Sequence, residues 1–302
     1  MDGSASAILF IHAGGLKKNI HYVQAGKLDE AWEDSGLVAR ADPVLIVDLS
    51  PNAMELAREM TRRPNTYVID HHKTAERFAL LLNFTISIGN EACGCELFRR
   101  WLVSNGFHAV CRLSPESNDT FTAQHYKRFT RLIDDHDRWQ LKIPFSIKLP
   151  VFFSFVGQSD FVERFMNVET RFGEEKDSYW TPFEQDLINV IEKRQESKFA
   201  KLLTKFKVRP MQFQGRWIKV GYLVDGVVNN SELLNRYLLA NPEVDVACQI
   251  NFDLDKVAFR SRTPGVDVSA LAAQWGGGGH QAASGHSFPD GIVNTVIGAL
   301  HG

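Results

Sequence analysis

Two short apolar segments near the start of the chain each end in side chains that can bind metals or protons. The segment 43–50, PVLIVDLS, carries Asp48 near its end, and the segment 66–70, TYVID, runs directly into His71. Their length and β-branched content predict buried strands, and the segment 51–61 between them predicts a helix. In such β-α-β units, ligands bind beyond the carboxyl ends of the parallel strands, so we expect a functional site there.

The whole chain predicts two α/β domains. Its 302 residues exceed the roughly 100 to 200 that are typical of one domain. The first part alternates strands and helices, which favours a mostly parallel sheet. The stretch 182–206 is polar and lacks glycine, which indicates a connecting helix. We predict an N-terminal domain at 1–165, a largely helical linker at 166–206 and a smaller mixed α/β domain at 207–302.

Further elements follow from hydrophobic periodicity and turn residues. Strands are predicted at 217–224, 244–251 and 256–262. Helices are predicted at 90–105, 123–137, 231–240, 268–275 and 290–300. The helix at 123–137 ends in Asp134-Asp135-His136-Asp137. Acidic residues at a helix C-terminus oppose the helix dipole, so this cluster predicts a nearby cation.

Composition is that of an ordinary globular protein, with 44% apolar and 23% charged residues. No apolar run reaches the roughly 18 residues of a membrane-spanning helix, and the first residues do not resemble a signal peptide. We therefore expect a cytoplasmic protein without a membrane partner. The four cysteines Cys93, Cys95, Cys111 and Cys248 do not match a zinc pattern, and we interpret them as reduced core thiols.

A formal net charge of −2 argues against binding to long duplex nucleic acid. Basic residues do cluster near the end of the predicted linker helix, at Lys193, Arg194, Lys198, Lys201 and Lys205. The same helix carries acidic residues, so we interpret the cluster as a solvated helix face.

Carboxylates combined with imidazoles suit divalent ions such as Mn²⁺ or Mg²⁺. Asp48, His71 and Asp135 are candidate ligands of this kind, and Mn²⁺ is the metal that we expect first. A strand that ends in Asp-His-His could by itself be purely structural. Two bound ions could bridge a phosphate, activate water and stabilise the leaving oxygen.

A glycine-rich loop in the second predicted domain is a candidate phosphate site. Gly276 to Gly279 precede His280, and glycines let backbone amides approach an anion closely. A flexible turn is the alternative explanation. Arg260 lies on a predicted strand ahead of this loop, and arginine suits forked contacts with phosphate.

These motifs together resemble the DHH phosphoesterases, specifically those with the DHH-associated C-terminal domain. They are VDLS at 47–50, VIDHH at 68–72, the acidic cluster at 134–137, FRS at 259–261 and GGGGH at 276–280. They follow the family's order over nearly the whole chain. The compact members that this chain resembles are oligoribonucleases, also called nanoRNases, and phosphatases of bisphosphate nucleotides.

The resemblance implies roles for individual residues. It implies metal ligation by Asp2, Asp48, His71 and Asp135, with Asp134 as the alternative to Asp135. It implies that Asp70 orients the histidines and that His72 lies near the substrate phosphate or behind the metal ligands, so both are candidate catalytic residues. It implies that Arg260, Gly277, Gly278, Gly279 and His280 hold the substrate.

The start of the chain departs from the family pattern. The first family motif is a strand, a histidine and Asp-x-Asp-Gly, whereas this chain begins Met1-Asp2-Gly3-Ser4. The resemblance then implies one nearly complete metal site and one reduced to the shared Asp48. A start assigned too late and a decayed enzyme are both open explanations, and we favour the first.

The resemblance implies a manganese-dependent hydrolase. Its expected substrates are short oligonucleotides, cleaved to mononucleotides, or 3′,5′-bisphosphate nucleotides. A phosphodiesterase of cyclic or linear dinucleotides and a non-catalytic nucleotide-binding protein are the alternatives. The oligomeric state is open, with a homodimer as one option.

Overall fold

The computed structural model describes residues 1–33, 38, 41–89, 91–108, 121–176, 178–225, 231–262 and 265–288. The chain forms two compact units, Met1–Ile191 and Glu192–Gly302, which divide within one long helix. Among the described residues, no helix combines the length and the apolar character needed to cross a membrane. Cys111 and the predicted helix at 290–300 lie outside the described residues.

The first unit is built around a parallel three-stranded sheet in the order β1-β2-β3. Its strands are β1 (Val44–Val47), β2 (Thr66–Asp70) and β3 (Phe84–Ile86). Its helices are α1 (Asp2–His12), α2 (Leu28–Glu33), α4 (Met54–Arg62), α5 (Gly94–Ser104), α6 (Gln124–Asp137), α7 (Pro144–Phe165) and α8 (Val168–Phe172), with short 3₁₀ segments η1 (Lys17–Asn19) and η2 (Lys73–Phe78). The predicted strand at 66–70 is confirmed in full.

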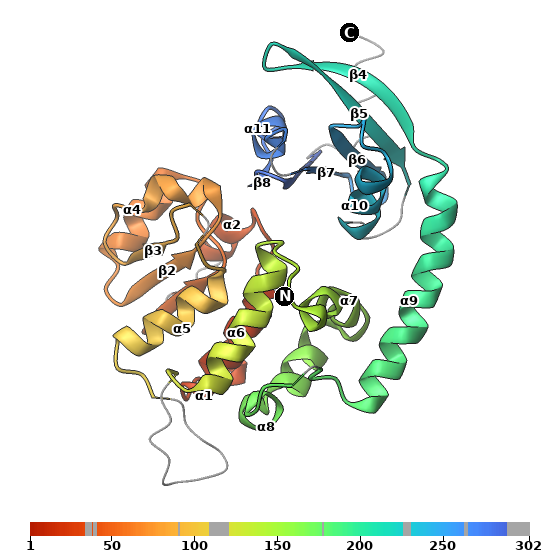
Figure 1. Cartoon of the computed structure of the whole chain (residues 1–302). Helices are drawn as coiled ribbons and strands as arrows, with labels where there is room; N and C mark the ends of the chain where they lie inside the picture. The colour runs from red at the N-terminus through yellow and green to blue at the C-terminus, as the bar shows by residue number, and fades with distance from the viewer. Residues whose placement is uncertain are drawn as a thin grey trace. The chain divides into compact units, whose positions relative to one another are not determined.

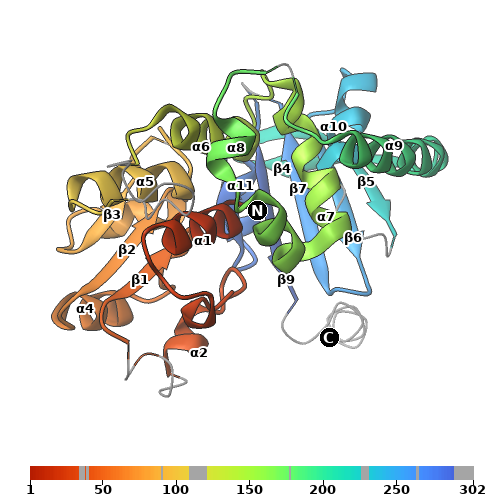
Figure 2. The same cartoon turned by 90° about the horizontal axis from the view of Figure 1, so that it is seen from below.

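Alternation along the strands separates two hydrophobic cores. Ile46 and Val68 point toward α2, α4 and η2, whereas Val47 and Ile69 point toward α1, α5 and α6. Helices therefore cover both faces of the sheet, with α4 on one side and α1 and α5 on the other (Figures 1 and 2). This arrangement confirms the predicted α/β class and leaves the carboxyl ends of the strands available for polar residues.

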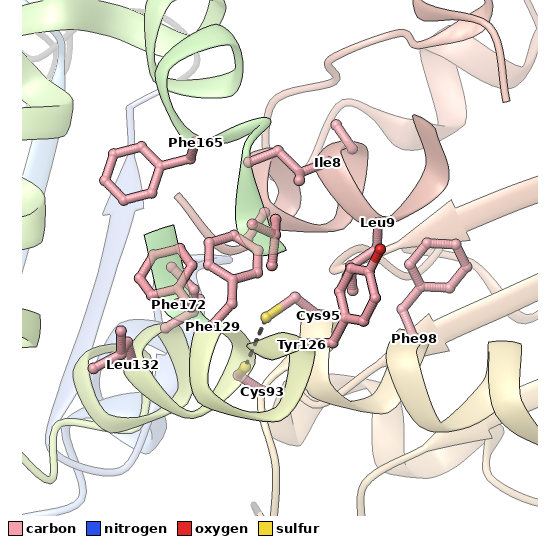
Figure 3. Close-up of a cluster of buried hydrophobic side chains, with 14 of the residues drawn as sticks. Ile8, Leu9, Cys93, Cys95, Phe98, Tyr126, Phe129, Leu132, Phe165 and Phe172 are labelled. Carbon is pink, nitrogen blue, oxygen red and sulfur yellow. Dashed lines mark hydrogen bonds between the residues drawn. The ribbon is translucent and has the colours of Figure 1, made fainter. Parts of the chain in front are cut away.

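The larger core lies between α1, α5, α6 and α7 and is rich in phenylalanine (Figure 3). Cys93 and Cys95 lie within it, with both side chains fully buried and their Sγ atoms 3.4 Å apart. Burial raises the pKa of Cys95 well above its ordinary value, so both are thiols at neutral pH. The pair fits the interpretation as reduced core residues.

The second unit contains a mixed six-stranded sheet in the order β4-β5-β6-β7-β9-β8. Its strands are β4 (Lys207–Phe213), β5 (Arg216–Val224), β6 (Val246–Asn251), β7 (Lys256–Ser261), β8 (Gly278–His280) and β9 (Ala283–Ser287). Its helices are α10 (Ser231–Ala240) and α11 (Val268–Ala273), and α9 (Pro182–Leu203) contributes its C-terminal half. β5 and β6 are parallel, and the other pairs are antiparallel.

The glycine-rich segment forms a hairpin and not an irregular loop. Gly278 pairs with Gly285 and His280 pairs with Ala283 in the β8–β9 ladder. A Cβ atom on Gly277 would lie 2.2 Å from the carbonyl oxygen of Gly285. The glycine at this position is therefore required by the packing of the hairpin on itself.

Candidate metal centre

Asp48 directly follows β1 in a backbone conformation that is unusual for a residue with a side chain. Its φ angle is 65°, in the left-handed region, which costs free energy outside glycine and is most accessible to Asp and Asn. Its amide donates to the carbonyl of Ile69 at 2.8 Å, so the turn is tied to β2. The amide of Gly3 donates to Asp48 Oδ2 at 3.1 Å.

Asp2 opens α1 and is held by the first turn of another helix. The amides of Gly94 and Cys95, at the N-terminus of α5, donate to its Oδ2 and Oδ1 at 2.6 and 2.8 Å. A helix N-terminus stabilises a carboxylate in this position. A Cβ on Gly94 would lie 3.0 Å from both Asp2 Oδ2 and Asp48 Cβ, so glycine permits the close approach of the three elements.

His71 lies at the centre of three carboxylates. Its Nε2 atom is 3.2 Å from Asp48 Oδ1, 3.3 Å from Asp137 Oδ2 and 3.6 Å from Asp2 Oδ2. His71 and Asp2 are buried, whereas the side chains of Asp48 and Asp137 are 21% and 25% exposed. The cluster is therefore closed behind His71 and reaches solvent past the other two carboxylates.

The cluster strongly perturbs its own pKa values. Burial, followed by the charges of Asp48 and Asp137, raises the pKa of Asp2 to about 8. Burial and the charge of Asp48 also raise the pKa of Asp137. Burial disfavours a charged His71, but the hydrogen bond to Asp48 and the neighbouring carboxylates outweigh it and raise its pKa to about 10. Without a bound cation, the three carboxylates of the cluster would therefore carry more negative charge than the single imidazolium of His71 can neutralise.

The donor set fits a divalent cation. Asp2, His71 and Asp137 each place one ligand atom within 4.8 Å of the others, and Asp48 belongs to an overlapping group with His71. Asp137 Oδ2 is buried and accepts no hydrogen bond among the described residues. Carboxylate oxygens with one imidazole suit hard or borderline ions such as Mn²⁺ and Mg²⁺. A bound cation would replace the protons that the raised pKa values retain.

The acidic end of α6 contributes Asp137 and not the expected Asp135. Asp135 accepts from the amides of Lys142 and Ile143 at 3.1 and 3.0 Å and from the Ser146 hydroxyl, so it stabilises the turn into α7. The alternative, Asp134, accepts from Arg138 and from the Cys93 amide. The structure therefore places Asp137 in the cluster around His71 in the position expected for Asp135, which makes Asp137 the candidate ligand from α6.

Asp70 and His72 form a second pair beside the cluster. Asp70 Oδ1 accepts from the His71 amide at 2.8 Å and from His72 Nδ1 at 2.7 Å. Burial opposes a charged Asp70, but the His72 hydrogen bond outweighs this effect and lowers its pKa. Asp70 is thus an ionised acceptor that orients His72, whose side chain is one-third exposed.

Comparison with known proteins adds to this geometry. Oligoribonuclease NrnB of Bacillus subtilis (strain 168) is 25% identical over 310 residues, covering 98% of this chain and 69% of that protein. Uncharacterized protein R106 of Acanthamoeba polyphaga mimivirus is 25% identical over 250 residues, covering 77% of this chain and 50% of that protein. No family model matches the chain.

A solved structure shares the fold. PggH, a pGpG-specific phosphodiesterase from Vibrio cholerae, has a TM-score of 0.50 and 15% sequence identity, covering 99% of this chain and 94% of that chain. The motif order, the alignment with NrnB and this fold agree. The alignment with NrnB and the shared fold are consistent with the resemblance of the motifs to the DHH phosphoesterases.

The residues expected to hold the substrate lie in the second unit. Arg260, on β7, donates to the Phe259 carbonyl at 2.8 Å and to the Ser231 hydroxyl. Its buried Nε atom has no acceptor among the described residues, and burial lowers its pKa to about 10. Gly278 to His280 form β8 of the hairpin described above, and Gly277 precedes it. Arg260 therefore retains a donor for a ligand oxygen.

Two residues of the metal centre were missed by sequence reasoning. Asp137 was visible as part of the acidic cluster, but its helical register could not be chosen. Gly94 stands between two cysteines inside the helix predicted at 90–105, and nothing in the sequence marked it as the first residue of α5. The roles of both residues depend on contacts with Asp2 or His71, which lie far away in the sequence.

Proposed function

We propose that this protein is a metal-dependent phosphodiesterase that hydrolyses short oligonucleotides to mononucleotides. The observation that carries this proposal is the convergence of Asp2, Asp48 and Asp137 on His71 Nε2. The likeness to an oligoribonuclease over almost the whole chain supports an activity on oligonucleotides. Mn²⁺ is the cation that we propose for the site, with Mg²⁺ as the alternative.

The protein's own groups have separable tasks in this proposal. Asp2, Asp48, His71 and Asp137 would hold the cation, which supplies an activated water and stabilises charge on the phosphate when it is bound. The α5 N-terminus keeps Asp2 in place through two amides. Asp70 holds the proton on His72 Nδ1, so that the opposite ring edge is presented in a fixed orientation toward a substrate phosphate.

Metal dependence and substrate class can be tested together. The protein is treated with a chelator and then supplied with Mn²⁺ or Mg²⁺, and products are separated after incubation with a dinucleotide, a short RNA or a 3′,5′-bisphosphate nucleotide. We expect mononucleotides from the first two substrates with Mn²⁺, and no product from the chelated protein.

A variant of the cluster tests whether turnover depends on the bound metal. Asp48→Asn removes one negative charge and should abolish both turnover and tight Mn²⁺ binding measured by calorimetry. Tight nucleotide binding without turnover in the metal-loaded wild type would overturn the proposal and indicate a nucleotide-binding protein. Phosphate release from bisphosphate nucleotides alone would redirect it to a phosphatase.

A further inference from the structure

One stretch of the second unit concentrates exposed positive charge. Between residues 193 and 219 the chain carries nine basic side chains and one acidic side chain, although the formal net charge of the chain is −2. All nine basic side chains are exposed. The remainder of the chain is therefore net negative, and this stretch differs from a solvated surface with interspersed charges.

The first part of the stretch is a stripe along the C-terminal half of α9 and the turn that follows it. Arg194, Lys198 and Lys201 are spaced by four and three residues, which places them on one face of α9, and Lys205 lies in the turn two residues after the helix ends. At 1.5 Å per residue the three helical residues span about 10 Å. Phe199 and Leu202 lie on a different face and are buried against Leu223 and Leu233, so the stripe itself faces solvent.

The one acidic residue within the stretch does not neutralise this stripe, whereas Lys205 Nζ forms an ion pair at 3.9 Å with Asp225 Oδ2 outside the stretch. Glu196 is two residues from Arg194 and Lys198, which rotates it about 200° away from Arg194 at 100° per residue. Its Oε1 atom pairs with Arg236 Nη1 at 2.7 Å. Glu196 is therefore engaged on the opposite side of the helix.

The second part of the stretch is the β4–β5 hairpin, which continues from the end of α9 (Figure 1). One face, with Phe213 and Ile218, packs on the core of the unit. The other face presents Trp217, which is 71% exposed, and Lys219. Exposed aromatic rings among cations are the feature that proteins use to stack bases of unpaired strands while binding their phosphates.

Protection of a sheet edge explains only part of this pattern. β4 is an edge strand, and charged residues or Pro210 there discourage pairing with another chain. That role requires neither a stripe along α9 nor an exposed tryptophan on the inner strand β5. The positive charge of the helix stripe and the exposed ring of Trp217 together favour a ligand that is both anionic and aromatic.

We propose that this surface binds single-stranded nucleic acid. We name it the basic ribbon, and it consists of the α9 stripe (Arg194, Lys198, Lys201 and Lys205) with Trp217 and Lys219 of the hairpin. It would extend the substrate class of the proposed function, on which this inference rests, from short oligonucleotides to longer strands. A duplex fits less well, because its paired bases are not available to Trp217.

Strand binding is measured on the full chain in the presence of a chelator, which prevents hydrolysis. A labelled single-stranded RNA of about twenty nucleotides is long enough to contact the whole ribbon. The ribbon variant replaces all four stripe residues with glutamine. The matched control replaces four exposed basic residues on helices of the first unit with glutamine, at Arg58, Lys127, Arg131 and Arg164.

We expect the ribbon variant to bind the strand at least about tenfold more weakly than the control at low salt. The salt dependence of its log affinity should be shallower by up to about 3, at roughly 0.7 for each phosphate that the variant no longer neutralises. Trp217→Ala should weaken binding by roughly tenfold, because the bases have no ring on which to stack. Dinucleotide hydrolysis with Mn²⁺ should be unchanged in all three variants.

The outcomes separate the two proposals. Equal strand binding by the ribbon variant and the control would overturn the ribbon, even if dinucleotides are hydrolysed. Loss of strand binding in the ribbon variant of a chain that hydrolyses nothing would support the ribbon and overturn the proposed function. Tighter ribbon-dependent binding to duplex RNA or to phosphatidylserine vesicles would overturn the assignment to single strands.

Discussion

The metal centre of the first unit and the glycine hairpin of the second both rely on glycine for close packing, but to different ends. Gly94 brings an α-helix N-terminus against Asp2 and Asp48, so that charged groups are gathered against their electrostatic preference. Gly277 and Gly279 bring the hairpin backbone against itself. The first arrangement costs stability unless a cation binds, which supports the proposal of a metal site there. The hairpin glycines are already explained by packing.

The largest effect on the metal centre is expected from a substitution at the acidic end of α6. Asp137→Asn removes a carboxylate from the cluster around His71, and we expect turnover to fall by about a thousandfold or more, equivalent to about 4 kcal/mol. Mn²⁺ affinity, measured by calorimetry, should fall in parallel. Asp135→Asn serves as the control at the neighbouring position.

Asp135 accepts hydrogen bonds only from the turn into α7 in the described structure. Its replacement by asparagine should lower the free energy of unfolding by about 1–3 kcal/mol while leaving Mn²⁺ affinity within about twofold of wild type. The reverse result, with metal binding lost in Asp135→Asn and kept in Asp137→Asn, would restore Asp135 as the ligand.

The α6 terminus also shows how far the sequence could predict the site. The strand ends that deliver Asp48, Asp70 and His71 follow from apolar runs and their polar ends, and β2 was predicted to the residue. Successive residues at a helix end point about 100° apart, so Asp134, Asp135 and Asp137 face different neighbours. Only the packing of α6 beside α1 and α5 selects Asp137.

Other misses have equally local causes. β3 has three residues, which is too short for a periodic pattern. β8 consists of two glycines and a histidine, a composition that predicts a turn and not a strand. By contrast, α10 was predicted to its exact bounds because apolar residues repeat at helical spacing between polar ends.

The next largest effect is expected on the stability of the β8–β9 hairpin. Gly277→Ala places a methyl group 2.2 Å from the Gly285 carbonyl oxygen and 2.5 Å from His286 Cβ. We expect the free energy of unfolding of the second unit to fall by about 3 kcal/mol, because backbone atoms must move apart. Thermal unfolding followed by fluorescence would report the loss, and Mn²⁺ affinity of the first unit should stay unchanged.

Gly276 offers a matched control in the same segment. Its φ angle is 73°, but a Cβ there would meet nothing within 4 Å. Asparagine adopts this conformation readily, so Gly276→Asn should cost less than about 1 kcal/mol. Equal destabilisation by the two substitutions would mean that chain flexibility, and not close packing, is what the glycines provide.

A smaller effect is expected at the glycine of the metal centre. Gly94→Ala brings a methyl group to 3.0 Å from Asp2 Oδ2, which must shift by a few tenths of an ångström. We expect Mn²⁺ affinity to fall by about 10- to 100-fold, as is typical when groups that orient metal ligands are disturbed. In Gly3→Ala the added Cβ is at an ordinary 3.7 Å from Asp48 Oδ2, so affinity should be unchanged. Equal affinities of the two variants would contradict the packing role of Gly94.

The smallest effect concerns a buried acid that is fully satisfied. Glu184 makes two 3.0 Å hydrogen bonds with Arg171 and accepts from the Thr181 amide, while the Thr181 hydroxyl accepts from the Glu184 amide. This capping box begins α9. Burial disfavours a charged Glu184, but Arg171 and Thr181 outweigh it and lower its pKa, the opposite of Asp2. Burial alone therefore does not produce the raised pKa values of the metal centre.

The pH dependence follows from this direction. Because the folded pKa of Glu184 lies below its unfolded value of about 4.3, its contribution is complete above that pH and is lost as pH falls through the folded pKa. Glu184→Gln should cost about 1–2 kcal/mol in urea unfolding at pH 7, and the difference from wild type should shrink below about pH 4. The exposed pair of Glu163 with Lys17 supplies the control, since Glu163→Gln should produce no resolvable change at any pH. A wild-type advantage over Glu184→Gln that grows on acidification would show that the ion pair with Arg171 is not what stabilises the start of α9.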